Sequence, residues 1–235
     1  MNDIKRSLKL LKYSMKPKTI LAVIAVFLLA SVLLEVFSCF VCPEVFFDPK
    51  LGGTLTFPLG SLFLLLTPMY YIQMSYGLNI FGYIKSSGFS KKMMWDAANV
   101  IYGGLMILAY SIVVINRVIL VYNHPEFTKY AVMALFEAAV MAIFFNIYSA
   151  FVYKYYIIAV VLFLLIYFPV YFSMIGMGFD LTEFMNKIQA LSFGQAVGIG
   201  YGMVIVSLII YYVCTRLCYR VPISKIVFRQ YFKKR

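Results

Sequence analysis

The sequence predicts an all-α polytopic membrane protein that forms a single transmembrane domain over residues 1–235. Three observations support this fold class. The chain is 63% apolar and its mean hydropathy is +0.89, well above the values typical of soluble domains. Its apolar residues form six separate runs of membrane-spanning length, and its basic residues collect on one side of those runs. Lipid is therefore expected to be its main solvent.

Each apolar run is long enough to form one transmembrane helix. A hydrocarbon layer about 30 Å thick needs roughly 20 helical residues, because a helix rises about 1.5 Å per residue. Six transmembrane helices are therefore predicted. They lie at about residues 20–41, 58–80, 99–121, 131–152, 155–177 and 196–218.

The distribution of basic residues predicts the orientation. Seventeen of the 21 lysines and arginines lie before the first span, between the second and third, between the fourth and fifth, or from Arg216 near the end of the sixth span to Arg235. The positive-inside rule places these segments in the cytoplasm. We therefore expect a multi-pass protein of the cytoplasmic (inner) cell membrane with both termini inside and a basic tail over residues 219–235. Because the net charge of +12 is divided among these segments, it suits anionic lipid headgroups and not nucleic acid.

Residues 2–16 are expected to form an amphipathic helix on the inner leaflet. Basic residues occupy one face of this segment, and Pro17 ends it. A simple topogenic anchor would explain the same pattern. The apolar residues recur at steps of four, three and four, as Ile4, Leu8, Leu11 and Met15.

Two of the spans contain prolines. Pro58 and Pro68 lie in the second span and Pro169 in the fifth, so each of these spans is expected to kink or to begin irregularly. The connection between the fourth and fifth spans is about two residues long, which forces an antiparallel helical hairpin.

A short helix is expected on the outer side, before the last span. Between residues 180 and 194 the apolar residues have helical spacing, and Gly178 and Gly194 flank the segment. Two placements stay open for this helix, either at the outer membrane surface or dipping back into the membrane. Its apolar positions are Leu181, Phe184, Ile188 and Leu191.

Groups for catalysis or metal binding are scarce. The single histidine, His124, lies in an outer loop, and all four aspartates lie in loops or at span ends. A multi-histidine metal site and a membrane-embedded aspartyl pair are therefore excluded. The phosphate-binding loop Gly-x-x-x-x-Gly-Lys-Ser/Thr does not occur. We expect a protein that is not an enzyme, has no cofactor and has no nucleotide site of its own.

The last span contains a glycine motif. Gly194, Gly198 and Gly202 give two consecutive Gly-x-x-x-Gly spacings, which allow close helix contact in lipid. Gly198, Gly200 and Gly202 resemble the start of a dinucleotide fingerprint, but no βαβ unit surrounds them. Helix packing is the better interpretation.

Three charged residues lie inside the predicted spans. Glu35, Arg117 and Glu137 are about six, four and six residues from the outer ends of their spans, which places them roughly 6 to 9 Å deep. A charge at this depth is expected to face the bundle interior and to be paired. The three residues are predicted to form one charged cluster. A structural ion pair and a part of a substrate exit path remain alternative roles.

The central depth of the membrane carries no charge. Gln73 is polar and nearly central, and Asn146 lies nearer the inner side. A carrier driven by an ion gradient usually needs an ionisable or ion-coordinating group near the midplane. The pattern therefore favours an apolar route for an amphipathic substrate.

The inner loop between the second and third spans has a composition suited to docking. It is short, basic and rich in hydroxyl groups, and it exposes one phenylalanine. It is predicted to insert into a groove on a partner, although a simple positively charged turn has the same composition. The residues are Ser87, Gly88, Phe89, Ser90, Lys91 and Lys92.

These features together resemble an ABC-2-type transporter permease subunit over the whole chain. The features are the basic N-terminal helix, six spans with both ends inside, the Ser90-Lys91-Lys92 loop, the outer helix and the missing nucleotide site. In that family the loop after the second span is a coupling helix that fits a cleft in the ATP-binding subunit. The family's usual proline is missing from this loop.

The resemblance implies an assembly of two permease chains, as a homo- or heterodimer, with two cytoplasmic ATP-binding cassette subunits. Its expected cargo is an amphipathic peptide, a lipid or a drug-like molecule that is exported. The alternative is a non-transporting membrane immunity or sensor protein that binds a peptide through its outer loops. An unrecognised membrane enzyme is a third class.

Overall fold

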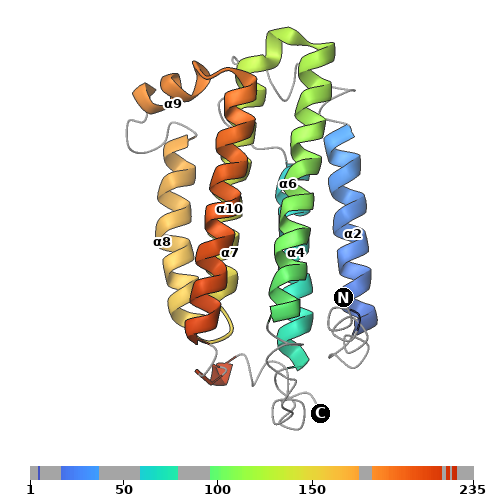
Figure 1. Ribbon diagram of the computed structural model, residues 1–235, viewed down its shortest axis with the longest axis vertical. Coiled ribbons are helices and arrows are strands. Elements are labelled where there is room, and N and C mark those ends of the chain that lie inside the picture. The colour runs from blue at the N-terminus through green and yellow to red at the C-terminus, as the bar shows by residue number, and fades with distance from the viewer. Residues whose placement is uncertain are drawn as a thin grey trace.

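The computed structural model describes Lys5 and residues 17–36, 59–78, 96–174, 182–218, 221, 222 and 224–226. Within these residues all regular secondary structure is helical. The long helices stand side by side and alternate in direction along the chain (Figure 1). They are α2 (Pro17–Val36), α4 (Leu59–Leu78), α6 (Ala97–Asn123), α7 (Thr128–Phe151), α8 (Tyr156–Met174) and α10 (Phe193–Leu217).

Two short helices mark one end of the bundle. The 3-10 helix η4 (Pro125–Phe127) links α6 to α7, and α9 (Thr182–Gln189) precedes α10. We call this end the η4 end, and the opposite end, where Lys154 lies between α7 and α8, the Lys154 end. Helix α2 begins and α10 ends at the Lys154 end (Figure 1).

A long helix lies in each of the six predicted segments. In three of these segments the described helix is long and apolar enough to cross a bilayer. The segments 97–123, 125–151 and 193–217 are long and apolar enough to cross a membrane. At about 1.5 Å per residue each exceeds the roughly 30 Å of a hydrocarbon core. The described apolar stretches of α2, α4 and α8 are shorter. Among the described residues, three helices are therefore long and apolar enough to span a membrane, and the full set of six spans stays a prediction.

Local sequence signals explain several helix ends. Pro17 is the first residue of α2, a position where its missing N–H has no cost. Ser192 caps α10: its Oγ accepts a hydrogen bond from the Gln195 N–H at 3.3 Å, and the Ser192 N–H donates to Gln195 Oε1 at 3.0 Å. This reciprocal pair is a capping box. The helix of α4 continues through Pro68.

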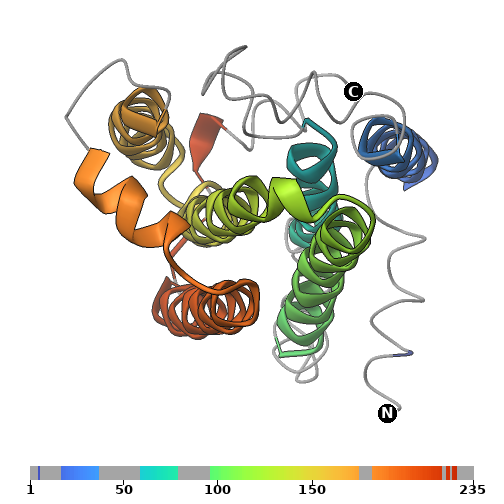
Figure 2. The same cartoon turned by 90° about the horizontal axis from the view of Figure 1, so that it is seen from above.

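Helix α7 occupies the centre of the bundle. It contacts α4, α6, α8, α9 and α10, while α2 packs against α4 at the edge (Figure 2). The main core lies between α4, α6, α7 and α10. Its fully buried side chains include Leu65, Tyr102, Met106, Tyr110, Leu135 and Val204.

Helix α9 runs across the η4 end of the bundle (Figures 1 and 2). Its Ile188 is buried in a cluster with residues of α7 and α10, and the Phe184 ring meets Phe136 at 5.7 Å. Glu183 and Lys187 form an exposed ion pair at 2.6 Å. The predicted short helix is therefore present with one packed face and one charged face.

Candidate functional site

Several predicted site residues lie outside the described part of the chain. They are the docking loop Ser87, Gly88, Phe89, Ser90, Lys91 and Lys92 and the N-terminal apolar face Ile4, Leu8, Leu11 and Met15. Glu35 belongs to α2, but its side chain is also outside the description. The predictions for these residues remain predictions.

Arg117 and Glu137 are buried charged residues in the bundle interior. Arg117 of α6 is 0% exposed and Glu137 of α7 is 3% exposed. Arg117 Nη2 donates a long hydrogen bond of 3.5 Å to Ser61 Oγ of α4. The prediction that these charges face the bundle is consistent with this burial, and the guanidinium links α6 to α4.

The two charges lie at less similar depths than the sequence suggested. Arg117 is six residues from the end of α6 at Asn123, and Glu137 is nine residues from the start of α7 at Thr128. These spacings correspond to depths of about 9 and 14 Å below the η4 end. The difference arises because α6 ends later and α7 begins earlier than predicted.

Side-chain direction reduces this difference. Side chains on a helix lean toward its N-terminus, and α6 and α7 run in opposite directions. Arg117 therefore leans toward the Lys154 end, and Glu137 leans toward the η4 end, so each extends toward the depth of the other. Their joining in one cluster stays a prediction.

A second set of buried polar residues lies nearer the Lys154 end. Tyr102 OH of α6 donates to Asn146 Oδ1 of α7 at 2.7 Å. Asn146 Nδ2 donates to Ser207 Oγ of α10 at 2.7 Å, and Ser207 Oγ donates to the Val204 carbonyl of its own helix at 2.8 Å. The amide of Asn146 thus joins three helices.

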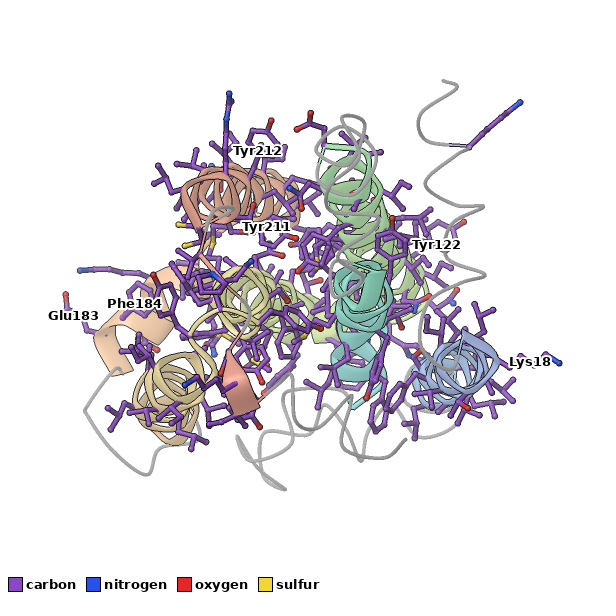
Figure 3. The ribbon with its side chains drawn as sticks, turned by 90° about the horizontal axis from the view of Figure 1, so that it is seen from below. Lys18, Tyr122, Glu183, Phe184, Tyr211 and Tyr212 are labelled. Carbon is purple, nitrogen blue, oxygen red and sulfur yellow. The ribbon has the colours of Figure 1, made fainter. Side chains whose placement is uncertain are left out.

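A third hydrogen bond between helices closes the ring of α6, α7 and α10. Tyr211 OH of α10 donates to Asn99 Oδ1 of α6 at 2.9 Å, and the Tyr102 and Tyr211 rings lie 4.5 Å apart. Figure 3 shows Tyr211 pointing inward from α10, whereas the neighbouring Tyr212 lies on its outer side. We call Asn99, Tyr102, Asn146, Ser207 and Tyr211 the three-helix polar network; none of them is more than 6% exposed.

The network has spare hydrogen-bonding capacity. Asn99 Nδ2 and the nearby Ser149 Oγ of α7, one turn beyond Asn146, are buried and make no hydrogen bond among the described residues. Buried polar atoms usually find a partner, often an ordered water. The Lys154 half of the core can therefore hold further polar groups.

Nearer the η4 end, tyrosines and a glycine pack α6 against α7 and α10. Tyr110 OH donates to the Leu135 carbonyl at 3.3 Å, and the Tyr110 ring meets Tyr201 edge-on at 5.1 Å. Tyr201 OH donates to Ser111 Oγ at 2.7 Å. A Cβ on Gly200 would lie 1.8 Å from Tyr110 Oη. Gly200 is therefore the glycine that permits close contact here.

The glycines singled out by their four-residue spacing behave differently. A Cβ added at Gly194, Gly198 or Gly202 would meet no atom within 4 Å. These three glycines face away from α7, because the buried stripe of α10 runs through Ala196 and Gly200. The expectation that they mediate helix contact is not met within the described part of this chain.

Sequence reasoning missed most of the polar network. Asn146 was noticed as a polar residue in a span, but Asn99, Tyr102, Ser207 and Tyr211 were not. A signal was available, since Ser207 and Tyr211 continue the helical spacing that begins at Ala196 and runs through Gly200 and Val204.

The Lys154 end is fastened by the segment after α10. Lys154 Nζ donates to the Val221 carbonyl at 2.5 Å, and the Ser224 N–H donates to the Tyr153 carbonyl at 2.9 Å. Lys225 nearby is exposed. The turn between α7 and α8 is thus held in place at the end that carries the basic residues.

Within the described residues, no group of three His, Cys, Asp or Glu side chains is placed to hold a metal ion. The polar features instead join helices to one another in an apolar bundle. No protein-family model, curated protein or solved structure matches the chain.

Proposed function

We propose that this chain is the membrane-spanning permease subunit of an ATP-driven exporter of the ABC-2 type. The observation that carries the proposal is the alternating helical bundle, in which α2 begins and α10 ends at the basic Lys154 end (Figure 1). The six predicted crossings, with both ends predicted on the cytoplasmic side, fit a permease that receives force from cytoplasmic ATPases.

The outer surface of the bundle supports a membrane location. Large apolar side chains are exposed on α2, α6, α8 and α10, whereas the described polar network and the Arg117 and Glu137 side chains are buried. This is the arrangement expected when lipid surrounds the helices. Examples of exposed apolar residues are Leu29 at 62%, Val100 at 61%, Leu165 at 65% and Ile209 at 58%.

The energy source is expected in a partner. The sequence has no phosphate-binding loop, and an ABC-2-type permease works as two chains with two ATP-binding cassette subunits. The proposed cargo is an amphipathic peptide, a lipid or a drug-like molecule, because the described polar network lies at helix–helix contacts and the exposed sides of α2, α6, α8 and α10 carry large apolar residues.

Replacing Phe89 with aspartate is expected to abolish copurification of a cytoplasmic ATPase. The substitution puts a charge on the apolar residue of the docking loop, where desolvating it in a groove is unfavourable. The measurement is affinity purification of the tagged chain from native membranes in mild detergent, followed by mass spectrometry and an ATPase assay.

The matched control is Phe89→Leu, which keeps an apolar side chain and should retain the ATPase. Loss of the ATPase with Phe89→Leu as well would show that the groove recognises more of Phe89 than its apolar character. If the unaltered chain brings down no ATPase at all and binds a peptide from its outer face, the permease proposal is wrong and the immunity or sensor function takes its place.

A further inference from the structure

We infer that α6, α7 and α10 move as one rigid unit, and that α8 is the helix that shifts against this unit. The role of that shift in moving cargo rests on the proposed function. The mechanical claim itself concerns this chain alone.

Side-chain hydrogen bonds join every pair among α6, α7 and α10. Tyr102 binds Asn146 between α6 and α7. Asn146 binds Ser207 between α7 and α10. Tyr211 binds Asn99 between α10 and α6. The three pairs form a closed triangle, so no helix of the three can slide or turn without breaking bonds to both of the others.

In a lipid bilayer, these hydrogen bonds determine which helices can move relative to one another. Between helices in a bilayer there is little hydrophobic driving force, so packing and interhelical hydrogen bonds hold the bundle together. Tyr102 and Asn146 are 0% exposed, so bulk water has no direct access to the atoms of a broken bond. Separation of these helices would leave several buried polar groups without partners.

Helix α8 is attached to the unit in a different way. The ring centroid of Phe163 lies 6.5 Å from that of Phe145 and 5.2 Å from that of Tyr148. These contacts with α7 are ring contacts and not hydrogen bonds, so a shift of α8 does not have to keep a hydrogen-bond geometry. Among the described side chains of α8, Ala159 is the one that is buried. Side chains of α8 are described for residues 156–166, and none of these makes a hydrogen bond to another described helix.

One end of α8 is fixed, which makes the motion a swing. The turn before α8 is tied to the segment after α10 by Lys154 with Val221 and by Tyr153 with Ser224. Displacement of α8 should therefore grow with distance from this turn. Figure 2 shows α8 at the edge of the bundle, beside α7 and α9, where no other long helix blocks it.

Spin-label distances on the chain in lipid nanodiscs test this inference. Leu108→Cys on α6 serves as the common label site, paired in turn with Ile209→Cys on α10, Leu165→Cys on α8 and Ile157→Cys near the α8 turn. All four side chains are exposed apolar residues. The native cysteines are replaced by alanine in the background.

We expect one narrow distance for Leu108 with Ile209, a broad or two-population distribution for Leu108 with Leu165, and an intermediate width for Leu108 with Ile157. The double substitution Tyr201→Phe with Tyr211→Phe keeps both rings, removes the side-chain bonds from α10 to Ser111 and Asn99 of α6, and should broaden the Leu108–Ile209 distance. Tyr102→Phe, which removes the bond between α6 and α7, should broaden it less. Tyr122→Phe, at an 86% exposed position, should change nothing.

The inference is overturned if the Leu165 distance is as narrow as the Ile209 distance. It is also overturned if both the Tyr201→Phe, Tyr211→Phe double variant and Tyr102→Phe, purified as folded protein, leave the Ile209 distance unchanged. Tyr102→Phe decides this point by itself if the double variant does not fold. The experiment uses no partner, so failure to find an ATPase would affect the proposed function and leave this result standing.

Discussion

Replacing Gly200 with alanine is expected to destabilise the bundle more than an alanine at any other glycine described in α10. The added Cβ would lie 1.8 Å from Tyr110 Oη and 2.9 Å from Tyr110 Cζ, distances that real Cβ atoms do not tolerate. Either the tyrosine or the helix has to move, and α10 packs against α7 along this stripe.

Tyr110 has little freedom to give way. Its side chain is 0% exposed, its hydroxyl is bonded to the Leu135 carbonyl, and its ring contacts Tyr201. Overpacking of a filled core costs about 1 to 3 kcal/mol, and loss of the hydrogen bond adds about 1 kcal/mol. We expect a loss of roughly 2 to 4 kcal/mol in the free energy of unfolding, measured by steric trapping in bicelles.

Gly198→Ala and Gly202→Ala are matched controls on the same helix. Neither new Cβ meets an atom within 4 Å, so the higher helix propensity of alanine should leave stability unchanged or raise it by up to about 1 kcal/mol in the free chain. Tyr110→Leu should partly rescue Gly200→Ala by removing the clashing hydroxyl. Equal effects of alanine at 198, 200 and 202, with no rescue, would show that α10 does not pack on Tyr110.

The positions of the helices could be predicted because they depend on local information. A run such as residues 196–218 is apolar enough to identify a helix without reference to any neighbour, and α10 occupies Phe193–Leu217. The ends are set by finer chemistry, such as the Ser192–Gln195 capping box, and were displaced by a few residues. Those displacements changed the estimated depths of Arg117 and Glu137.

The contacts between helices could not be predicted in the same way. They depend on how far each helix is rotated and shifted relative to its neighbours, and an apolar helix in lipid has no solvent-facing polar stripe to reveal its buried face. Glycine spacing therefore pointed to Gly198 and Gly202, whereas the buried face contains Gly200. The same ambiguity concealed the meeting of Tyr102, Asn146 and Ser207 from three separate segments.

Reversing the charge of Arg117 is expected to have the second large effect. Arg117→Glu places a carboxylate at a fully buried position of the bundle interior, where Glu137 is already a nearly buried carboxylate. Breaking a buried charge pair costs about 3 to 5 kcal/mol, because it leaves an uncompensated charge. The yield of monodisperse protein and its free energy of unfolding should both fall sharply.

Exchanging the charges of residues 117 and 137 tests whether Glu137 is the partner of Arg117. If Arg117 and Glu137 belong to one cluster, Glu137→Arg should restore part of the stability lost in Arg117→Glu. Ser61→Ala is the control for the contact between Arg117 and Ser61. Its effect on the free energy of unfolding should stay below about 1 kcal/mol because the 3.5 Å hydrogen bond is long. A destabilised Arg117→Glu with no rescue would assign the arginine to another carboxylate, for which Glu35 is the candidate from sequence.

A double apolar replacement separates the two roles open to this pair. Arg117→Leu with Glu137→Leu removes both charges together, and a buried ion pair replaced by apolar side chains is often neutral or stabilising. Under the proposed function, if the charges serve structure alone, the double variant should fold, bind the ATPase and export cargo as well as the unaltered chain. If the charges line the route of the cargo, the variant should fold and bind the ATPase with equal yield, yet export should fail, because the polar atoms that met the cargo are gone.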